Sequence, residues 1–117
     1  MNTELRERLL KALPLNKERV EVPGWGPTWV RELDGHGRSV VEHAASGVSK
    51  DPTQGLKRYE ALHVVLGVVD DNDAPVFTEA DVDALLSLPS RTLRCVFRAV
   101  QRLSALDTDA KEEARGN

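Results

Sequence analysis

The chain has 117 residues, a length typical of a single domain. Its 16 Lys and Arg against 19 Asp and Glu give a formal net charge of -3, so the overall charge indicates neither nucleic acid nor a membrane as a partner. Aromatic residues make up only 4%, and we therefore expect a core of Leu, Val and Ala. The single cysteine, Cys95, excludes an internal disulfide. No apolar run approaches the ~20 residues of a membrane span, and the first residues lack a signal-peptide pattern.

The first third of the chain predicts a helix and a β-hairpin. Leucines recur every fourth residue over 3–13, which is a helical spacing, and a proline follows. Residues 18–33 predict the hairpin, because Val20 and Val22 alternate with charged residues as in a half-buried strand. The turn residues are Pro and Gly within 23–27. A lone hairpin is marginally stable in water, so this one is expected to pack on helices.

Two helices and a loop follow in the middle of the chain. Residues 35–46 have one apolar face, and Asp34 precedes them as a candidate N-cap. We expect a loop over 47–55. Residues 56–69 predict the central helix, because their apolar positions keep helical spacing throughout, although 64–69 alone would also suit a strand.

The last third predicts two further helices and a polar end. Residues 70–75 form a polar turn, and Thr78 is a candidate N-cap for a short helix that follows it. Pro89 separates this helix from a last, amphipathic helix over about 90–105. Residues 107–117 are polar and predict a flexible C-terminal tail.

The elements together predict an α+β, mostly α-helical fold. An N-terminal helix and a β-hairpin are followed by about four helices and the disordered tail. We expect one domain over 1–106 and no second domain or internal repeat.

The spacing of the candidate ligands and nucleophiles does not match the motifs of several kinds of site. The acidic turn invites a calcium loop, but counting from Asp71 puts Pro75 at a ligand position and Val76 at the required glycine. The three histidines form no metal motif, and Cys95 has no recognisable base partner. His63 lies on the apolar side of its helix, which is typical of a hydrogen-bonded core residue. No Lys follows the Gly-Trp-Gly turn as a phosphate loop requires. We expect no catalytic residue, no metal, no cofactor and no enzyme activity.

The last helix carries the clearest candidate for a binding surface. Four arginines at spacings of three and four form one stripe: Arg91, Arg94, Arg98 and Arg102. The stretch 70–83 holds six acids and no Lys or Arg. One interpretation is that this stretch neutralises the stripe within the fold; the other is that the stripe binds an acidic partner.

The turn before the last helix and the tryptophan at the hairpin end each allow more than one interpretation. A basic second helix after a tight turn also suits a small helix-turn-helix DNA-binding regulator, although the net charge is acidic and the neighbouring acids would oppose phosphate contact. This is the alternative function. Trp25, at the hairpin end, is a candidate partner-binding residue, because Trp is enriched at binding hot spots. We expect Trp29 to pack on the strand face instead.

The order of these segments resembles the tail assembly chaperones of long, non-contractile-tailed bacteriophages (siphophages) and related prophages. The likeness covers roughly residues 5–106. Single segments carry little information, but their order and spacing are fairly specific. The stretches that carry it are 20–26 followed by 29–33, then 58–71, and then 75–85 continued by 93–106. The chain departs from the pattern at Gly35–Gly37, at Asn72–Ala74 and in the arginines of the last helix, which is more basic than expected.

The resemblance implies a scaffold-type role in viral tail assembly. Such a protein binds the tape measure protein, recruits tail tube subunits (the major tail tube protein), and is absent from the finished virion. It would act in the cytoplasm of the bacterial host. In many phages a ribosomal frameshift extends some copies after the C-terminal region. Exposed apolar helix faces make self-association a further expectation. Nucleic acid and membrane are not expected partners.

Overall fold

The protein is described by a computed structural model that covers residues 2–11, 13–46 and 52–105, without the side chains of 52–57. It is an α+β fold, mostly helical, as predicted. The elements in chain order are α1 Thr3–Leu10, β1 Lys17–Val22, β2 Gly26–Arg31, α2 Gly35–Ala45, α3 Pro52–Gly67, β3 Val68–Val69, the 3-10 helix Glu79–Asp81, α4 Val82–Leu86 and α5 Ser90–Leu103. The predicted tail, 107–117, lies outside the described residues.

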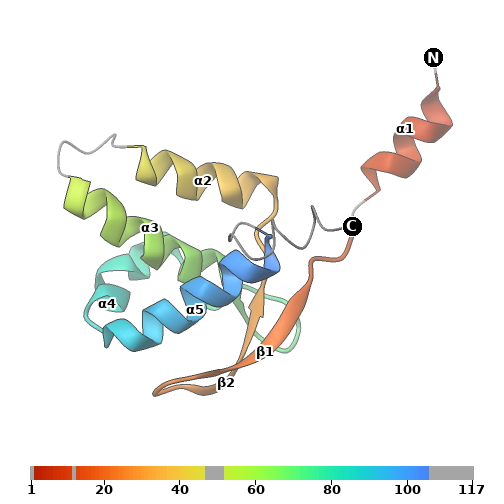
Figure 1. The fold of residues 1–117 in the computed structure, drawn as a ribbon. Helices are drawn as coiled ribbons and strands as arrows, with labels where there is room; N and C mark the ends of the chain where they lie inside the picture. Colours follow the sequence, from red (N-terminus) through yellow and green to blue (C-terminus); the bar gives the residue numbers. More distant parts are fainter. Residues whose placement is uncertain (1, 12, 47–51, 106–117) are drawn as a thin grey trace, which may run out of the picture.

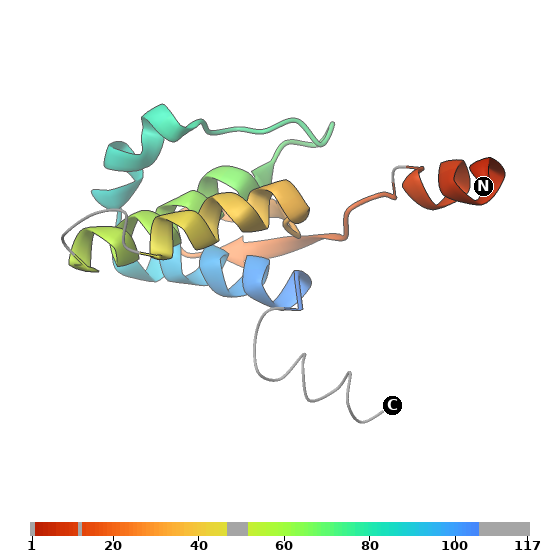
Figure 2. The ribbon, with the colours of Figure 1, turned by 90° about the horizontal axis from the view of Figure 1, so that it is seen from above.

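Three helices stack outward from a small sheet. The sheet has the order β1-β2-β3, and both pairs are antiparallel. α5 packs on the hairpin, α3 packs on α5, and α2 packs on α3 (Figures 1 and 2), with α4 just before the start of α5. α1 projects away from this body and buries none of its residues. No helix in the described ranges has both the length and the apolar character to cross a membrane.

The core is aliphatic, as the composition predicts. Side chains from the central strand and from the two long helices are fully shielded from solvent: Val30, Val64, Val96 and Val100. Because β-branched side chains are stiff, a core of this kind loses little rotamer freedom on folding. The sheet and α5 are therefore held together chiefly by valine packing across the β2–α3–α5 layer.

The hairpin and the helix starts follow the predicted turn chemistry. Pro23 and Gly24 occupy the turn, Gly24 has a positive φ of 86°, and the Trp25 amide donates to the Val22 carbonyl at 3.0 Å. Asp34 caps α2 by accepting from the Gly37 amide at 2.7 Å. These local signals determine where the elements begin, largely independently of the rest of the chain.

The predicted central helix was wrong at both ends. It begins at Pro52 rather than residue 56, consistent with the preference of proline for the first helical position, so the predicted loop 47–55 is shorter and its residues 47–51 lie outside the described residues. It ends at Gly67, because Val68 and Val69 leave the helix and pair with Val30 and Trp29 of β2. α1 and α5 end earlier than predicted, at Leu10 and Leu103.

Gly67 lies at a tight contact between α3 and α5. A Cβ placed on Gly67 would lie 2.4 Å from Cγ2 of Val100 and 3.5 Å from the Arg31 carbonyl oxygen. Val100 is itself fully buried, so it has no solvent-facing space into which to move. Glycine is therefore required at this position by the approach of α5.

Gly67→Ala is expected to lower the free energy of unfolding by about 1–3 kcal/mol, the usual cost of overpacking a tight core. Chemical denaturation monitored by circular dichroism would measure it. Gly35→Ala is the matched control, because a Cβ there meets no atom within 4 Å. It should be neutral or slightly stabilising, as Gly-to-Ala changes in helices usually are. Equal stability of Gly67→Ala and the wild type would contradict the close approach.

Candidate partner-binding surface

α5 is divided lengthwise into a buried face and an arginine face. Its inner positions, which include Leu93, Val96 and Val100, pack into the core. Its outer positions place all four predicted arginines on one exposed strip: Arg91, Arg94, Arg98 and Arg102. The 3.6-residue period that predicted the stripe therefore places these side chains together in the structure.

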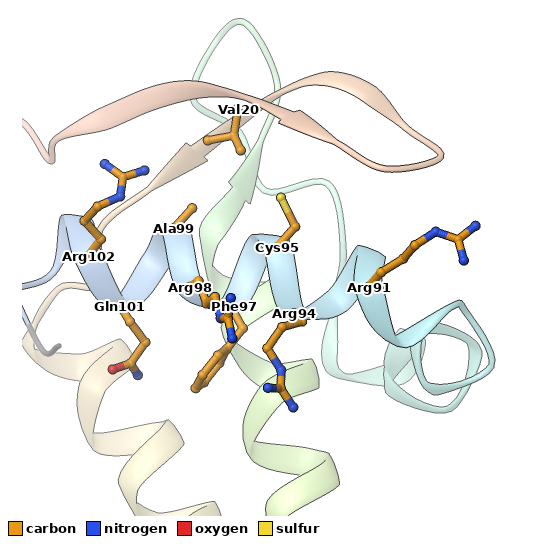
Figure 3. A pocket seen from close by; sticks show the side chains of 9 residues that line it. All are labelled: Val20, Arg91, Arg94, Cys95, Phe97, Arg98, Ala99, Gln101 and Arg102. Carbon is orange, nitrogen blue, oxygen red and sulfur yellow. The ribbon is translucent and has the colours of Figure 1, made fainter.

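The arginine face lines a shallow, open depression of about 770 Å³. Apolar groups from α5 and from β1 line it on the two sides of the arginine row: Val20, Cys95, Phe97 and Ala99. Figure 3 shows Val20 on the hairpin side of α5, with Cys95 and Ala99 pointing toward it, and Phe97 on the opposite side near α3. An apolar floor that flanks a central row of guanidinium groups suits a ligand that is amphipathic and acidic.

Specific hydrogen bonds hold α5 against the hairpin. The buried Thr92 hydroxyl donates to the Pro23 carbonyl at 2.7 Å, and the Cys95 thiol contacts the Glu21 carbonyl at 3.6 Å. At the other end of the helix, the Leu33 amide donates to the Ser104 hydroxyl at 2.9 Å. One end of α5 is thus fixed to the hairpin and the other to the chain just after β2, so the outer face is presented on a rigid support.

Two of the four arginines form ion pairs with carboxylates from other elements. Arg102 binds Glu18 through both guanidinium nitrogens, at 2.7 and 3.1 Å, and this contact lowers the pKa of the Glu18 carboxyl. Arg94 lies 3.4 Å from Glu60. Within the described residues, neither Arg91 nor Arg98 has a carboxylate within salt-bridge distance.

The acidic stretch 70–83 does not neutralise the arginine face in the described part of the chain. Its salt bridges run to Lys17, which lies 2.6 Å from Asp73, and to Arg58, which lies 3.7 Å from Glu79. The interpretation of internal neutralisation by this stretch was therefore wrong. The surface retains positive charge toward solvent, mainly at Arg91 and Arg98.

The two tryptophans lie away from this depression. Trp25 is half-buried and packs on Phe77, with ring centroids 5.8 Å apart, and it is not among the residues that line the depression. Trp29 lies on the sheet face as expected, where its indole N–H donates to Asp71 at 2.8 Å and Lys17 stands over its ring. The structure therefore does not join Trp25 to the arginines in a single site.

A buried histidine supports the α3 side of the depression. His63 is fully buried, and its Nδ1 donates to the Tyr59 carbonyl at 2.8 Å. The carbonyl can only accept, so Nε2 is the unprotonated nitrogen and accepts from the Gln101 amide at 2.8 Å. The predicted core role of His63 is confirmed, and the Gln101 and Phe97 side chains that it contacts both line the depression.

An exposed apolar surface lies on and just after α1. Leu9, Leu10 and Leu13 are 70%, 66% and 83% exposed. Periodicity indicates which side chains share a face, but it does not show whether another element covers that face.

Within the described residues, no cluster of three or more His, Cys, Asp or Glu is arranged to hold a metal ion.

Comparison with known proteins shows the class of fold. No family model matches the chain, and no curated protein sequence matches it. Among solved structures, the fold is similar to that of the tail assembly chaperone of bacteriophage HK97. The match has a TM-score of 0.68 and covers 88% of this chain and 95% of that one, at 14% sequence identity. The chain therefore has a tail assembly chaperone fold, and the resemblance inferred from segment order is confirmed at the level of the fold.

Burial lowers the pKa of His63 below its usual value of about 6.5. The unfolded chain then binds this proton more readily than the folded chain. The stabilisation is complete above the unfolded pKa and is lost as the pH falls below it, down to the folded pKa. We expect the free energy of unfolding to fall between pH 7 and pH 5, by at most about 1.4 kcal/mol per pH unit for one proton.

Urea denaturation at several pH values would measure this dependence. His63→Gln should show a flatter profile over the same window, because the buried titrating group is gone. His36→Gln, at an exposed position near the start of α2, is the control and should keep the wild-type profile. An unchanged profile in His63→Gln would show that other groups cause the dependence.

Proposed function

We propose that this chain is a phage tail assembly chaperone that binds the tape measure protein and recruits tail tube subunits during assembly. The main support is the extent of the fold match to the HK97 chaperone, which spans nearly the whole of each chain. The proposed site of action is the cytoplasm of the bacterial host, and the proposed role is that of an assembly factor absent from the mature virion.

The arginine face of α5 is the proposed client-binding surface. A long helical protein such as a tape measure exposes apolar stripes before its partners cover them, and Val20, Cys95, Phe97 and Ala99 offer a small apolar floor for such a stripe. Arg91 and Arg98 would pair with acids beside the stripe. The depression is shallow and partly charged, which suits contacts that must be reversed when tube subunits replace the chaperone.

α1 is a second proposed contact element. Its exposed leucines cannot be buried by the described body of this chain in the observed arrangement, so a client segment or another copy of the chaperone would cover them. Self-association through this helix belongs to the same proposal. Trp25, at the hairpin end, is a third proposed contact.

DNA binding remains the alternative function, but its structural support is weaker. α4 has only five residues, and the basic α5 has Glu18 and Glu60 paired to two of its four arginines. Both carboxylates would lie near the phosphates of a bound duplex and oppose binding. A gel-shift at low salt would decide between the two functions.

Arg94→Glu with Arg98→Glu is the test of the client-binding surface. On coexpression, less tape measure protein should remain soluble with the double variant than with the wild-type chain. Its affinity for the client should fall by about tenfold or more, as for interfaces that lose complementary charge. Soluble yield and pull-down of the tagged tape measure protein would be measured together.

Arg19→Glu with Arg38→Glu is the matched control. It makes the same change of net charge at exposed positions on β1 and α2, away from the outer face of α5. Both double variants should keep the wild-type circular dichroism spectrum and similar thermal stability. Equal loss of client binding in both would indicate a bulk charge effect and reject the surface, and a tape measure protein equally insoluble with and without the wild-type chain would reject the chaperone role.

A further inference from the structure

We propose that the outer face of α5 is also the docking site of this chain's own acidic C-terminal segment, residues 107–117. This is an intrachain contact, and it does not depend on the identity of any client. An acidic partner of the same face would compete with the segment for it. Charge, chain direction and reach support it.

The charges of the segment complement those of the surface. Its acids are Asp107, Asp109, Glu112 and Glu113, against Lys111 and Arg115. Opposite them, Arg91 and Arg98 have no carboxylate partner within the described residues. The acidic stretch 70–83, the other concentration of negative charge in the sequence, forms its salt bridges elsewhere. The C-terminal segment is therefore the remaining acidic stretch of this chain that is suited to this face.

The backbone turns at the end of α5. The Ser104 amide donates to the Val100 carbonyl at 2.9 Å, and the Ala105 amide donates to the Arg102 carbonyl at 3.1 Å. Ala105 has a φ of 57°, in the left-handed region that ends helices and changes the chain direction. A residue other than glycine rarely adopts this conformation. A chain that reverses here can return along the face of α5.

The reach of the segment matches the spacing of the arginines. Counted back from Ala105 along the helix axis at ~1.5 Å per residue, Arg98 lies roughly 10 Å away and Arg91 roughly 21 Å away. An extended chain advances ~3.3 Å per residue, so Asp109 reaches roughly 13 Å and Glu113 roughly 26 Å from the same point. An extended return would thus bring Asp109 near Arg98 and Glu113 near Arg91.

The docked segment would compete with other acidic ligands of this face. Exposed ion pairs are individually weak, but a tether of this length gives the segment an effective concentration in the millimolar range. A client with higher charge density or a better apolar stripe would displace it, whereas weakly acidic proteins would not. The contact would thereby raise the selectivity of the same surface.

Paramagnetic relaxation enhancement by NMR tests the contact in the full chain. A spin label is placed at Ala114→Cys, with Cys95→Ser to leave a single thiol. Backbone amides of residues 91–102 should be broadened, and those of α2 should not. The matched control carries the same label with the four acids neutralised: Asp107→Asn, Asp109→Asn, Glu112→Gln and Glu113→Gln. In the control, broadening along α5 should fall at least threefold.

High salt tests whether the contact is electrostatic, and a mixture of labelled and unlabelled chains tests whether it lies within one molecule. In 1 M NaCl, where the Debye length is about 3 Å, the broadening in the native segment should fall toward that of the neutralised one. A dilute mixture of labelled chain and isotope-enriched unlabelled chain should show no broadening. Equal broadening with native and neutralised segments would overturn the proposal, and so would broadening found only between molecules, because the occupant would then be a second copy. None of these outcomes depends on a tail protein, so the proposed function can fail separately.

Discussion

The close approach of α3 and α5 at Gly67 is the constraint on which the rest of the structure depends. Because Gly67 has no side chain, Val100 packs directly against the α3 backbone. At the same point α3 ends, and Val68 and Val69 continue as the strand that pairs with β2. One small residue therefore allows a helix contact and a helix-to-strand change within three positions. A larger residue would separate α5 from the sheet and move the surface that α5 presents.

This packing leaves only the outer side of α5 available for binding. Its inner face is used by the core, and its ends are fixed to the hairpin through Thr92 and to the chain after β2 through Ser104. A helix held in this way loses little conformational entropy when a partner binds. Arginine side chains are long and can change rotamer, so the rigid part of the site is the apolar floor and the adaptable part is the row of guanidinium groups.

The sequence predicted the features that depend on local chemistry. Asp34 and Pro23-Gly24 indicated an N-cap and a turn, and the structure has both. Helical periodicity placed the four arginines on one face. The features it missed depend on contacts between distant segments: Glu18 is 84 positions from its partner Arg102, and β3 has only two residues, too few for a periodic signal. The position of α1 away from the body could not be predicted for the same reason, because the exposure of Leu9 and Leu13 depends on which other elements reach them.

The distribution of charge explains why the small net charge was a poor guide to the surface. A value of -3 averages over faces that differ in sign. In the acidic stretch 70–83, Asp71 accepts a hydrogen bond from Trp29 and Asp73 pairs with Lys17. These two carboxylates therefore contact the sheet and not the arginines of α5. On the α5 side, Glu18 and Glu60 engage Arg102 and Arg94, and the remaining positive charge is concentrated over an apolar floor. Because screening limits such fields to about 8 Å at physiological ionic strength, a partner senses this local face rather than the whole molecule. An acidic partner segment would therefore be attracted to this face despite the negative charge of the chain.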